Sequence, residues 1–158
     1  MKYFLSILFL LIIVNVGFTA GLPWGGDWND PPSYDDDCDI LMSSVSAQKG
    51  SEIYLPIWML ETTADKGGFD VSWNIDFLRV MNVSSSYCTV KVVTKTDKGV
   101  PKKYRFVCDN LNAKEKTSNI ATIKFRTQQN KGTTNVIVNR PTYDFYECAL
   151  LSGKVTVK

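Results

Sequence analysis

Residues 87–109, YCTVKVVTKTDKGVPKKYRFVCD, decide the fold, because they specify a β-hairpin together with its register. Two alternating apolar segments flank the turn residues Asp97-Lys98-Gly99, which is typical of a hairpin. When Lys98 is taken as the centre, the facing pairs are Val92 with Tyr104, Val90 with Phe106, and Cys88 with Cys108. A slip of one residue would turn the apolar side chains to the outer face and separate the two cysteines. The hairpin therefore predicts a Cys88–Cys108 bridge.

The other two cysteines, Cys38 and Cys148, then remain to join the start of the domain to its end. An even set of four cysteines is typical of a disulfide framework in an exported protein. A zinc site is disfavoured, since the chain has no C-x-x-C pair and no histidine. A bridge between Cys38 and Cys148 would close a loop of roughly 110 residues, which stabilises a fold by about 4–5 kcal/mol in the chain-entropy model.

Strand-like alternation of apolar and polar residues continues on both sides of the hairpin. The segments are 52–60, 68–76, 120–127, 134–139 and 153–158. Turn clusters such as ADKGG and QQNKG separate them, and no amphipathic helix is indicated. We therefore expect one all-β domain over residues 38–158. It should be a two-sheet antiparallel β-sandwich of about nine strands, stapled by two disulfides.

The N-terminal region has two parts of different character. Residues 1–20 contain one lysine and an apolar run before small residues, which indicates a secretory signal peptide. The run is short for a bilayer span of roughly 20 apolar residues, so we expect a secreted, extracellular protein with no membrane insertion. Residues 21–37 form an acidic leader. Residues 22–39 carry six aspartates and no Lys or Arg, whereas residues 40–158 carry 17 basic and 10 acidic residues, 17 − 10 = +7.

This charge asymmetry has a common explanation, an acidic segment that improves solubility, and a functional one. In the functional explanation, the leader folds back on a basic face of the domain, or that face binds a polyanion. Acidic polysaccharide is a better candidate for this polyanion than nucleic acid. Trp24 and Trp28 of the leader are candidate sugar-stacking groups, and they are also candidates to pack over Tyr54 and Trp58. The aspartates lack the glycine of an EF-hand loop, so we expect no cofactor and no metal site beyond weak calcium binding.

The order and spacing of several segments resemble cohesin domains. The segments are AQKGSEIYLPIWML (47–60), GGFDVSWNID (67–76), FLRVMNV (77–83), SNIATIKFRTQQNKGTTNVIV (118–138) and LLSGKVTVK (150–158). The resemblance covers roughly residues 43–158 and implies a jelly-roll sandwich. Cohesins of bacterial cellulosomes bind dockerins, so it also implies docking of a protein. Gly68 stands where some cohesins have Asn, Phe77 follows Asp76 where the family has Pro, and the four cysteines are not a family feature.

The resemblance implies that Asp70 matches the docking aspartate of the family. Register would place five further residues on the same outer face: Ser72, Asn74, Thr89, Lys91 and Arg105. The alternative is an ordinary solvated face of alternating polar residues. Tyr54 and Trp58 form a second candidate site, because aromatic rings on a strand face can stack on sugar rings. Asn82-Val-Ser84 is a glycosylation sequon.

These features favour a protein without catalytic activity. The chain has no histidine, which is the commonest general base and the usual partner of a Ser or Cys nucleophile. The carboxylates Asp70, Asp76 and Asp109 lie in no recognisable active-site motif. We expect a secreted binding module that recognises a polysaccharide or a glycosylated surface through one sheet. The alternative is a structural or adhesive coat or matrix protein that binds another protein in a cohesin-like manner.

Overall fold

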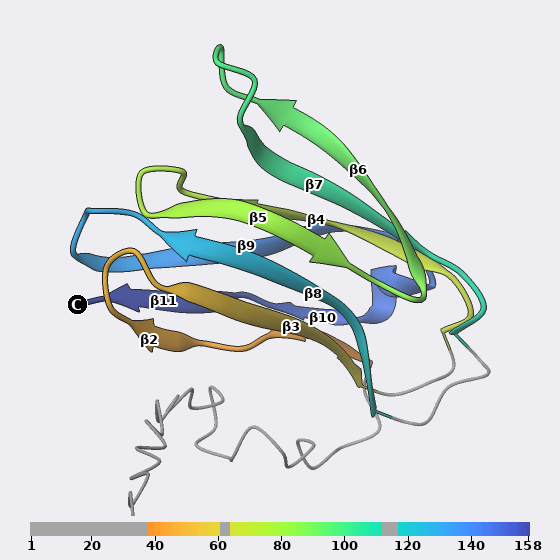
Figure 1. The fold of residues 1–158 in the computed structure, drawn as a ribbon. Helices are drawn as coiled ribbons and strands as arrows, with labels where there is room; N and C mark the ends of the chain where they lie inside the picture. Colours follow the sequence, from red (N-terminus) through yellow and green to blue (C-terminus); the bar gives the residue numbers. More distant parts are fainter. Residues whose placement is uncertain (1–37, 61–63, 112–116) are drawn as a thin grey trace, which may run out of the picture.

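The computed structural model describes residues 38–60, 64–111 and 117–158. These residues form eleven strands and one 3₁₀ helix (Figure 1). The elements are β1 (Asp39–Met42), β2 (Val45–Ala47), β3 (Glu52–Leu60), β4 (Gly67–Trp73), β5 (Leu78–Ser84), β6 (Cys88–Lys95), β7 (Pro101–Cys108), β8 (Thr117–Thr127), β9 (Gly132–Tyr143), η2 (Asp144–Glu147), β10 (Ala149–Leu151) and β11 (Gly153–Val157).

The strands form the two packed sheets of a jelly-roll sandwich, as the sequence predicts. One sheet has the order β10-β1-β3-β8-β5 and the other β2-β11-β9-β4-β7-β6. Neighbours pair antiparallel, except that β1 pairs with β10 and β2 with β11 in parallel. Two of the eleven strands, β2 and β10, have only three residues, and the remaining nine match the expected number. Figure 1 shows the two layers, with β6 and β7 rising away from them toward their turn.

The terminal strands close the sandwich by passing from one sheet to the other side by side. The chain leaves the five-stranded sheet after β1 and enters the six-stranded sheet as β2, and β10 and β11 follow the same course. At the crossing, the Ser44 hydroxyl accepts a hydrogen bond from the N–H of Lys154 at 3.0 Å. A Cβ at Gly153 would overlap the Ser43 carbonyl, so only glycine allows the two chains to approach this closely.

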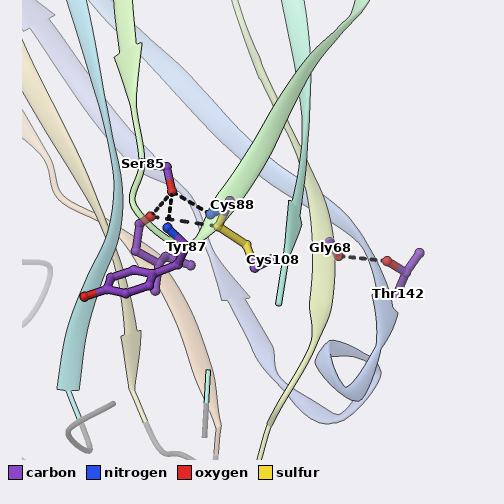
Figure 2. The surroundings of a disulfide bond; sticks show 7 residues. Gly68, Ser85, Tyr87, Cys88, Cys108 and Thr142 are labelled. Atoms are coloured by element: carbon purple, nitrogen blue, oxygen red, sulfur yellow. Dashed lines mark hydrogen bonds between the residues drawn. A yellow bond between two sulfur atoms is a disulfide. The ribbon is translucent and has the colours of Figure 1, made fainter. Parts of the chain in front are cut away.

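Both predicted disulfides are present. Cys38 is bonded to Cys148 and Cys88 to Cys108. The hairpin has the predicted register from Cys88↔Cys108 to Val92↔Tyr104. Nearer the turn, an irregularity places Thr94 opposite Lys103, and the predicted register returns at Lys95↔Pro101. In Figure 2, the Ser85 hydroxyl accepts hydrogen bonds from the N–H groups of Tyr87 and Cys88, at 3.2 and 2.8 Å, beside the second bridge.

Aromatic side chains from both sheets and from η2 fill the core. The rings of Phe69 and Phe106 stack at 5.0 Å, and Phe145 of η2 lies 6.1 Å from Phe69. Trp73 lies edge-on to Phe125 of the opposite sheet at 5.2 Å. Pairs in these geometries add about 0.5–1.5 kcal/mol beyond their buried area. The core therefore holds β4, the strand that carries Asp70, rigidly against both its neighbours and the other sheet.

Removing the Cys38–Cys148 bridge should destabilise the fold more than removing the Cys88–Cys108 bridge. The bridges span sequence separations of 110 and 20 residues. The chain-entropy model then gives about 5 and about 3 kcal/mol. Urea unfolding of the double variants C38A/C148A and C88A/C108A measures this difference. Equal losses, or the reverse order, would contradict the loop-length argument.

Candidate functional site

The outer face of the six-stranded sheet carries a row of polar side chains that crosses four adjacent strands. Lys91 of β6 pairs with Arg105 of β7, Arg105 with Asp70 of β4, and Asp70 with Asn139 of β9. The inward residues on either side of Asp70, Phe69 and Val71, belong to the core. The row therefore faces away from the other sheet. The row contains three residues that the sequence predicts, Asp70, Lys91 and Arg105. Its fourth member, Asn139, was not predicted.

Asp70 is the centre of this row and is 2% exposed. Its Oδ1 lies 3.1 Å from Nη1 of Arg105, and its Oδ2 lies 3.7 Å from Nζ of Lys103. Both cations are partly exposed and shield the carboxylate from solvent. A buried charge is tolerated when it is paired in this way. We call Asp70, Lys103, Arg105 and Asn139 the Asp70 cluster.

A β-bulge shapes the cluster from the side of β9. The pairing between β4 and β9 shifts between Gly68 and Asp70, and Arg140 in this bulge has a φ of 54°. Left-handed backbone is uncommon for a residue other than glycine and is often found at functional sites. The carbonyl of Arg140 accepts a hydrogen bond from Nη1 of Arg105 at 2.8 Å. The bulge thus fixes the guanidinium of Arg105 over the cluster.

Two oxygens of the Asp70 cluster lack hydrogen bonds. Nη1 of Arg105 donates to the Arg140 carbonyl, and its 3.1 Å contact with Asp70 Oδ1 is ionic, without the alignment of a hydrogen bond. Oδ1 of Asp70 and Oδ1 of Asn139 are both buried and accept no hydrogen bond from any described residue. Such oxygens are rare in folded proteins and costly. A donor from outside would reach these oxygens once the side chain of Lys103 or Arg105 moves aside.

Of the other residues predicted for this face, Ser72 and Thr89 lie on it and Asn74 does not. Ser72 lies on the face, opposite Lys103 and Ile137, and Thr89 lies opposite Val107. Asn74 does not lie on the strand, because β4 ends at Trp73. The Asn74 Oδ1 accepts the N–H of Asp76 at 2.9 Å, and its carbonyl accepts the N–H of Leu78 at 3.0 Å. Asn side chains commonly compete for backbone groups in turns, and alternation alone extended this strand too far.

The aromatic pair of the opposite sheet does not form a joined platform. Tyr54 is 55% exposed, but Nζ of Lys124 lies 5.3 Å from its ring centroid. Lys124 is in turn bridged to Glu52 at 2.7 Å, and this hydrogen bond lowers the pKa of Glu52 and raises that of Lys124. Trp58 is half-buried and pairs with the buried Leu41 of β1. The two rings are separated by the buried Pro56.

Some predictions fall outside the residues that the structure describes. Trp24 and Trp28, with the signal peptide, the acidic leader and its weak calcium binding, lie within residues 1–37 and remain predictions. Among the described residues, no three His, Cys, Asp or Glu side chains are grouped so that they could hold a metal ion. No helix within these ranges is long and apolar enough to cross a membrane.

Three residues of the site were missed from the sequence: Lys103, Asn139 and Arg140. Lys103 could have been predicted, because it lies two residues from Arg105 on the same strand and therefore on the same face. Asn139 and Arg140 could not have been predicted. They reach the cluster only through the pairing of β4 with β9, which joins segments far apart in the chain.

Asp144 holds the end of β9 to the start of β4 in the same sheet. Its Oδ2 accepts hydrogen bonds from the N–H groups of Lys66 and Asp65, at 3.1 and 3.0 Å. These bonds lower the pKa of Asp144 below its ordinary value of 3.8. Nζ of Lys66 lies 5.4 Å from the ring centroid of Tyr143, which is 60% exposed. The contacts hold the segment before β4 to the end of β9.

Comparison with known proteins identifies the fold. No protein-family model matches the chain, and no curated protein matches it. Among solved structures, a non-cellulosomal cohesin from Archaeoglobus fulgidus is similar at 15% identity, with 77% of this chain and 91% of that chain covered and a TM-score of 0.62. The seventh ScaB type I cohesin from Pseudobacteroides cellulosolvens is 14% identical, with 77% and 92% covered and a TM-score of 0.61.

A third similar structure is a type I cohesin–dockerin complex, Coh-OlpC-Doc435, from Clostridium thermocellum. It is 13% identical, with 82% of this chain and 98% of that chain covered and a TM-score of 0.62. At these identities the likeness concerns the fold. The chain has a cohesin-like jelly-roll fold, and the resemblance of its sequence segments to cohesins is confirmed at that level.

Replacing Asp144 by Asn should reduce the loss of stability at acidic pH. A carboxyl whose pKa is lowered by folding stabilises the protein above its unfolded pKa, and this contribution disappears as the pH falls through the folded value. The difference in urea midpoint between wild type and Asp144→Asn should therefore shrink between about pH 6 and about pH 3. Asp97→Asn is the control, since the Asp97 side chain makes no hydrogen bond among the described residues. A constant difference would contradict the assignment.

Asn82 should accept an N-linked glycan when the chain is secreted from a eukaryotic cell. It is exposed on β5, at the free edge of the five-stranded sheet, and such sequons are acceptors when they lie at the surface. Treatment with a glycan-removing amidase should lower the mass of the secreted chain, and Ser84→Ala should abolish this change. An unmodified wild-type chain would contradict the prediction.

Proposed function

We propose that this chain is a secreted, non-catalytic module that docks a protein partner on the outer face of its six-stranded sheet. The observation that carries the proposal is the buried Asp70 carboxylate on the outer face of this sheet, whose Oδ1 accepts no hydrogen bond from the described residues. A hydroxyl or N–H group of a partner would donate a hydrogen bond to this oxygen. A buried acceptor without a hydrogen bond is costly. The ion pair with Arg105 offsets part of that cost, and a partner's donor would supply the missing hydrogen bond.

The charge of the face defines the chemistry of the partner. Lys91 is exposed, and Lys103 and Arg105 are partly exposed around the single carboxylate. A complementary surface would present a hydroxyl or amide at its centre and carboxylates at its rim. Ile137 is 43% exposed on the same face and would contribute apolar contact next to Ser72. The fold agrees with such a role, because five of the similar structures come from cohesin–dockerin complexes.

Export is part of the same proposal. Two disulfides are typical of proteins that fold in an oxidising compartment, which agrees with the signal peptide inferred for residues 1–20. The alternative role of an adhesive coat or matrix protein also requires a protein partner. It differs in that the partner would be a fixed component of a matrix.

Recognition of a polysaccharide through Tyr54 and Trp58 is the second candidate. Its support is the exposure of Tyr54. Lys124 lies over the Tyr54 ring and Trp58 is half-buried, so a sugar would have to displace existing contacts. We therefore place the protein partner first, although the sequence alone favoured the polysaccharide.

The proposal predicts binding that depends on Asp70. Calorimetric titration of the mature chain with a panel of type I dockerins should identify a partner, and Asp70→Asn should weaken its binding by about tenfold or more, which is about 1.4 kcal/mol. The amide keeps the size of the side chain but loses its charge. Asp76→Asn, in the exposed turn after β4, should leave the affinity unchanged. Tyr54→Ala should also have no effect.

Three results would contradict this assignment. The first is a dockerin that binds wild type and Asp70→Asn equally. The second is a partner lost with Tyr54→Ala and kept with Asp70→Asn, which would move the site to the five-stranded sheet. The third is an absence of dockerin binding together with retention on neutral insoluble polysaccharides, which would favour the second candidate.

A further inference from the structure

The positive charge of the domain is concentrated in one hairpin. Residues 88–108 contain six basic residues and one acid, 6 − 1 = +5, whereas residues 40–158 as a whole carry +7. The remaining residues of that range therefore contribute only +2. The basic residues are Lys91, Lys95, Lys98, Lys102, Lys103 and Arg105. This concentration calls for an explanation of its own.

The hairpin also extends beyond the sandwich. Figure 1 shows the turn ends of β6 and β7 rising clear of the strands below them. Val92 follows the alternation of the inward-facing Val90, yet it is 41% exposed, and the adjacent Val93 is 49% exposed. The inward side of the hairpin near its turn thus meets solvent. The two strands have eight residues each and are about 26 Å long. Because β7 stays paired with β4 from Lys103 to Cys108, the part that projects is the end near the turn.

Most of its cations have no partner within the described protein. Lys103 and Arg105 lie on Asp70. Lys91, Lys95, Lys98 and Lys102 are exposed, and none of them forms an ion pair with a carboxylate of the described residues. Lys91 also pairs directly with Arg105, and like charges directly opposite on neighbouring strands are destabilising. Stability of the fold therefore does not explain this charge.

Protection of a sheet edge explains only part of it. Lysines on edge strands prevent pairing with another chain, and β6 is an edge of its sheet, which accounts for Lys91 and Lys95. Lys98 lies in the turn, however, and Lys102 lies on β7, an inner strand between β4 and β6. The charge continues past the edge, over the turn and down the second strand.

We infer that the β6–β7 hairpin is a binding site for an anionic polysaccharide, a linear chain of carboxylated or sulfated sugars. Ammonium groups along an extended ribbon match repeated anionic groups along such a chain, and they attract it over a distance of about 10 Å at 0.1 M salt. The exposed valines offer apolar contact to the carbon faces of sugar rings. Lys95, Lys98 and Lys102 lie outside the Asp70 docking site, which the hairpin meets at Lys91, Lys103 and Arg105. The inference does not depend on the proposed protein partner.

The test uses the mature chain with both disulfides intact, and immobilised polygalacturonate and heparin as probes. These separate carboxylated from sulfated ligands, and dextran is the neutral control. We expect retention on at least one anionic probe and none on dextran. The variant K95E/K98E/K102E should lose about tenfold or more in affinity, while K49E/K131E/K158E should stay within about twofold of wild type. The control makes the same change in net charge at exposed lysines outside the hairpin.

Three outcomes would overturn the inference. They are no retention on either anionic probe, equal losses for the two triple variants, and tighter binding to DNA or to vesicles of anionic lipid than to either polysaccharide. Should the glutamate variant fail to fold by circular dichroism, K95Q/K98Q/K102Q tests the same lysines with a smaller change in charge. Asp70→Asn should not weaken polysaccharide binding, because it removes a carboxylate from beside the hairpin, and the hairpin variant should keep dockerin binding, so the two proposals fail separately.

Discussion

The parallel pairing of the two ends of the domain is the constraint on which the structure depends. β1 and β2 run beside β10 and β11, and both chains pass between the sheets at the same place. The Cys38–Cys148 bridge fixes the start of this pairing. Because β11 supports β9, and β9 supports β4, the position of the Asp70 carboxylate depends on this closure at the far side of the sheet.

The inward and outward faces of β4 have opposite roles. Inward, Phe69 and Trp73 pack against aromatic rings and hold the strand in place. Outward, Asp70 lies under two cations that come from a single neighbouring strand. A rigid strand can keep an incompletely hydrogen-bonded carboxylate buried, since the surrounding structure does not relax to satisfy it. The core thus makes the polar site possible.

Sequence reasoning succeeded where neighbours in space are joined by short connections. The register around Cys88 and Cys108 followed from one turn, and it brought Lys91 opposite Arg105 correctly. It failed at the end of β4, because alternation does not reveal that the Asn74 side chain prefers a backbone N–H in the turn. It also could not find Asn139, since the pairing of β4 with β9 and its bulge are decided by the packing of the whole sandwich.

The parallel closure has a mechanical consequence. Tension applied at Cys38 and at Lys158 would bypass β1 and pass along β10 and β11, so the hydrogen bonds between β11 and its parallel neighbour β2 would be loaded together rather than one after another. The Cys38–Cys148 bond would carry the force directly to residue 148 and leave the 110-residue loop unstretched. Only the last strands would bear the load, and the two binding surfaces would keep their shape in a chain held under tension.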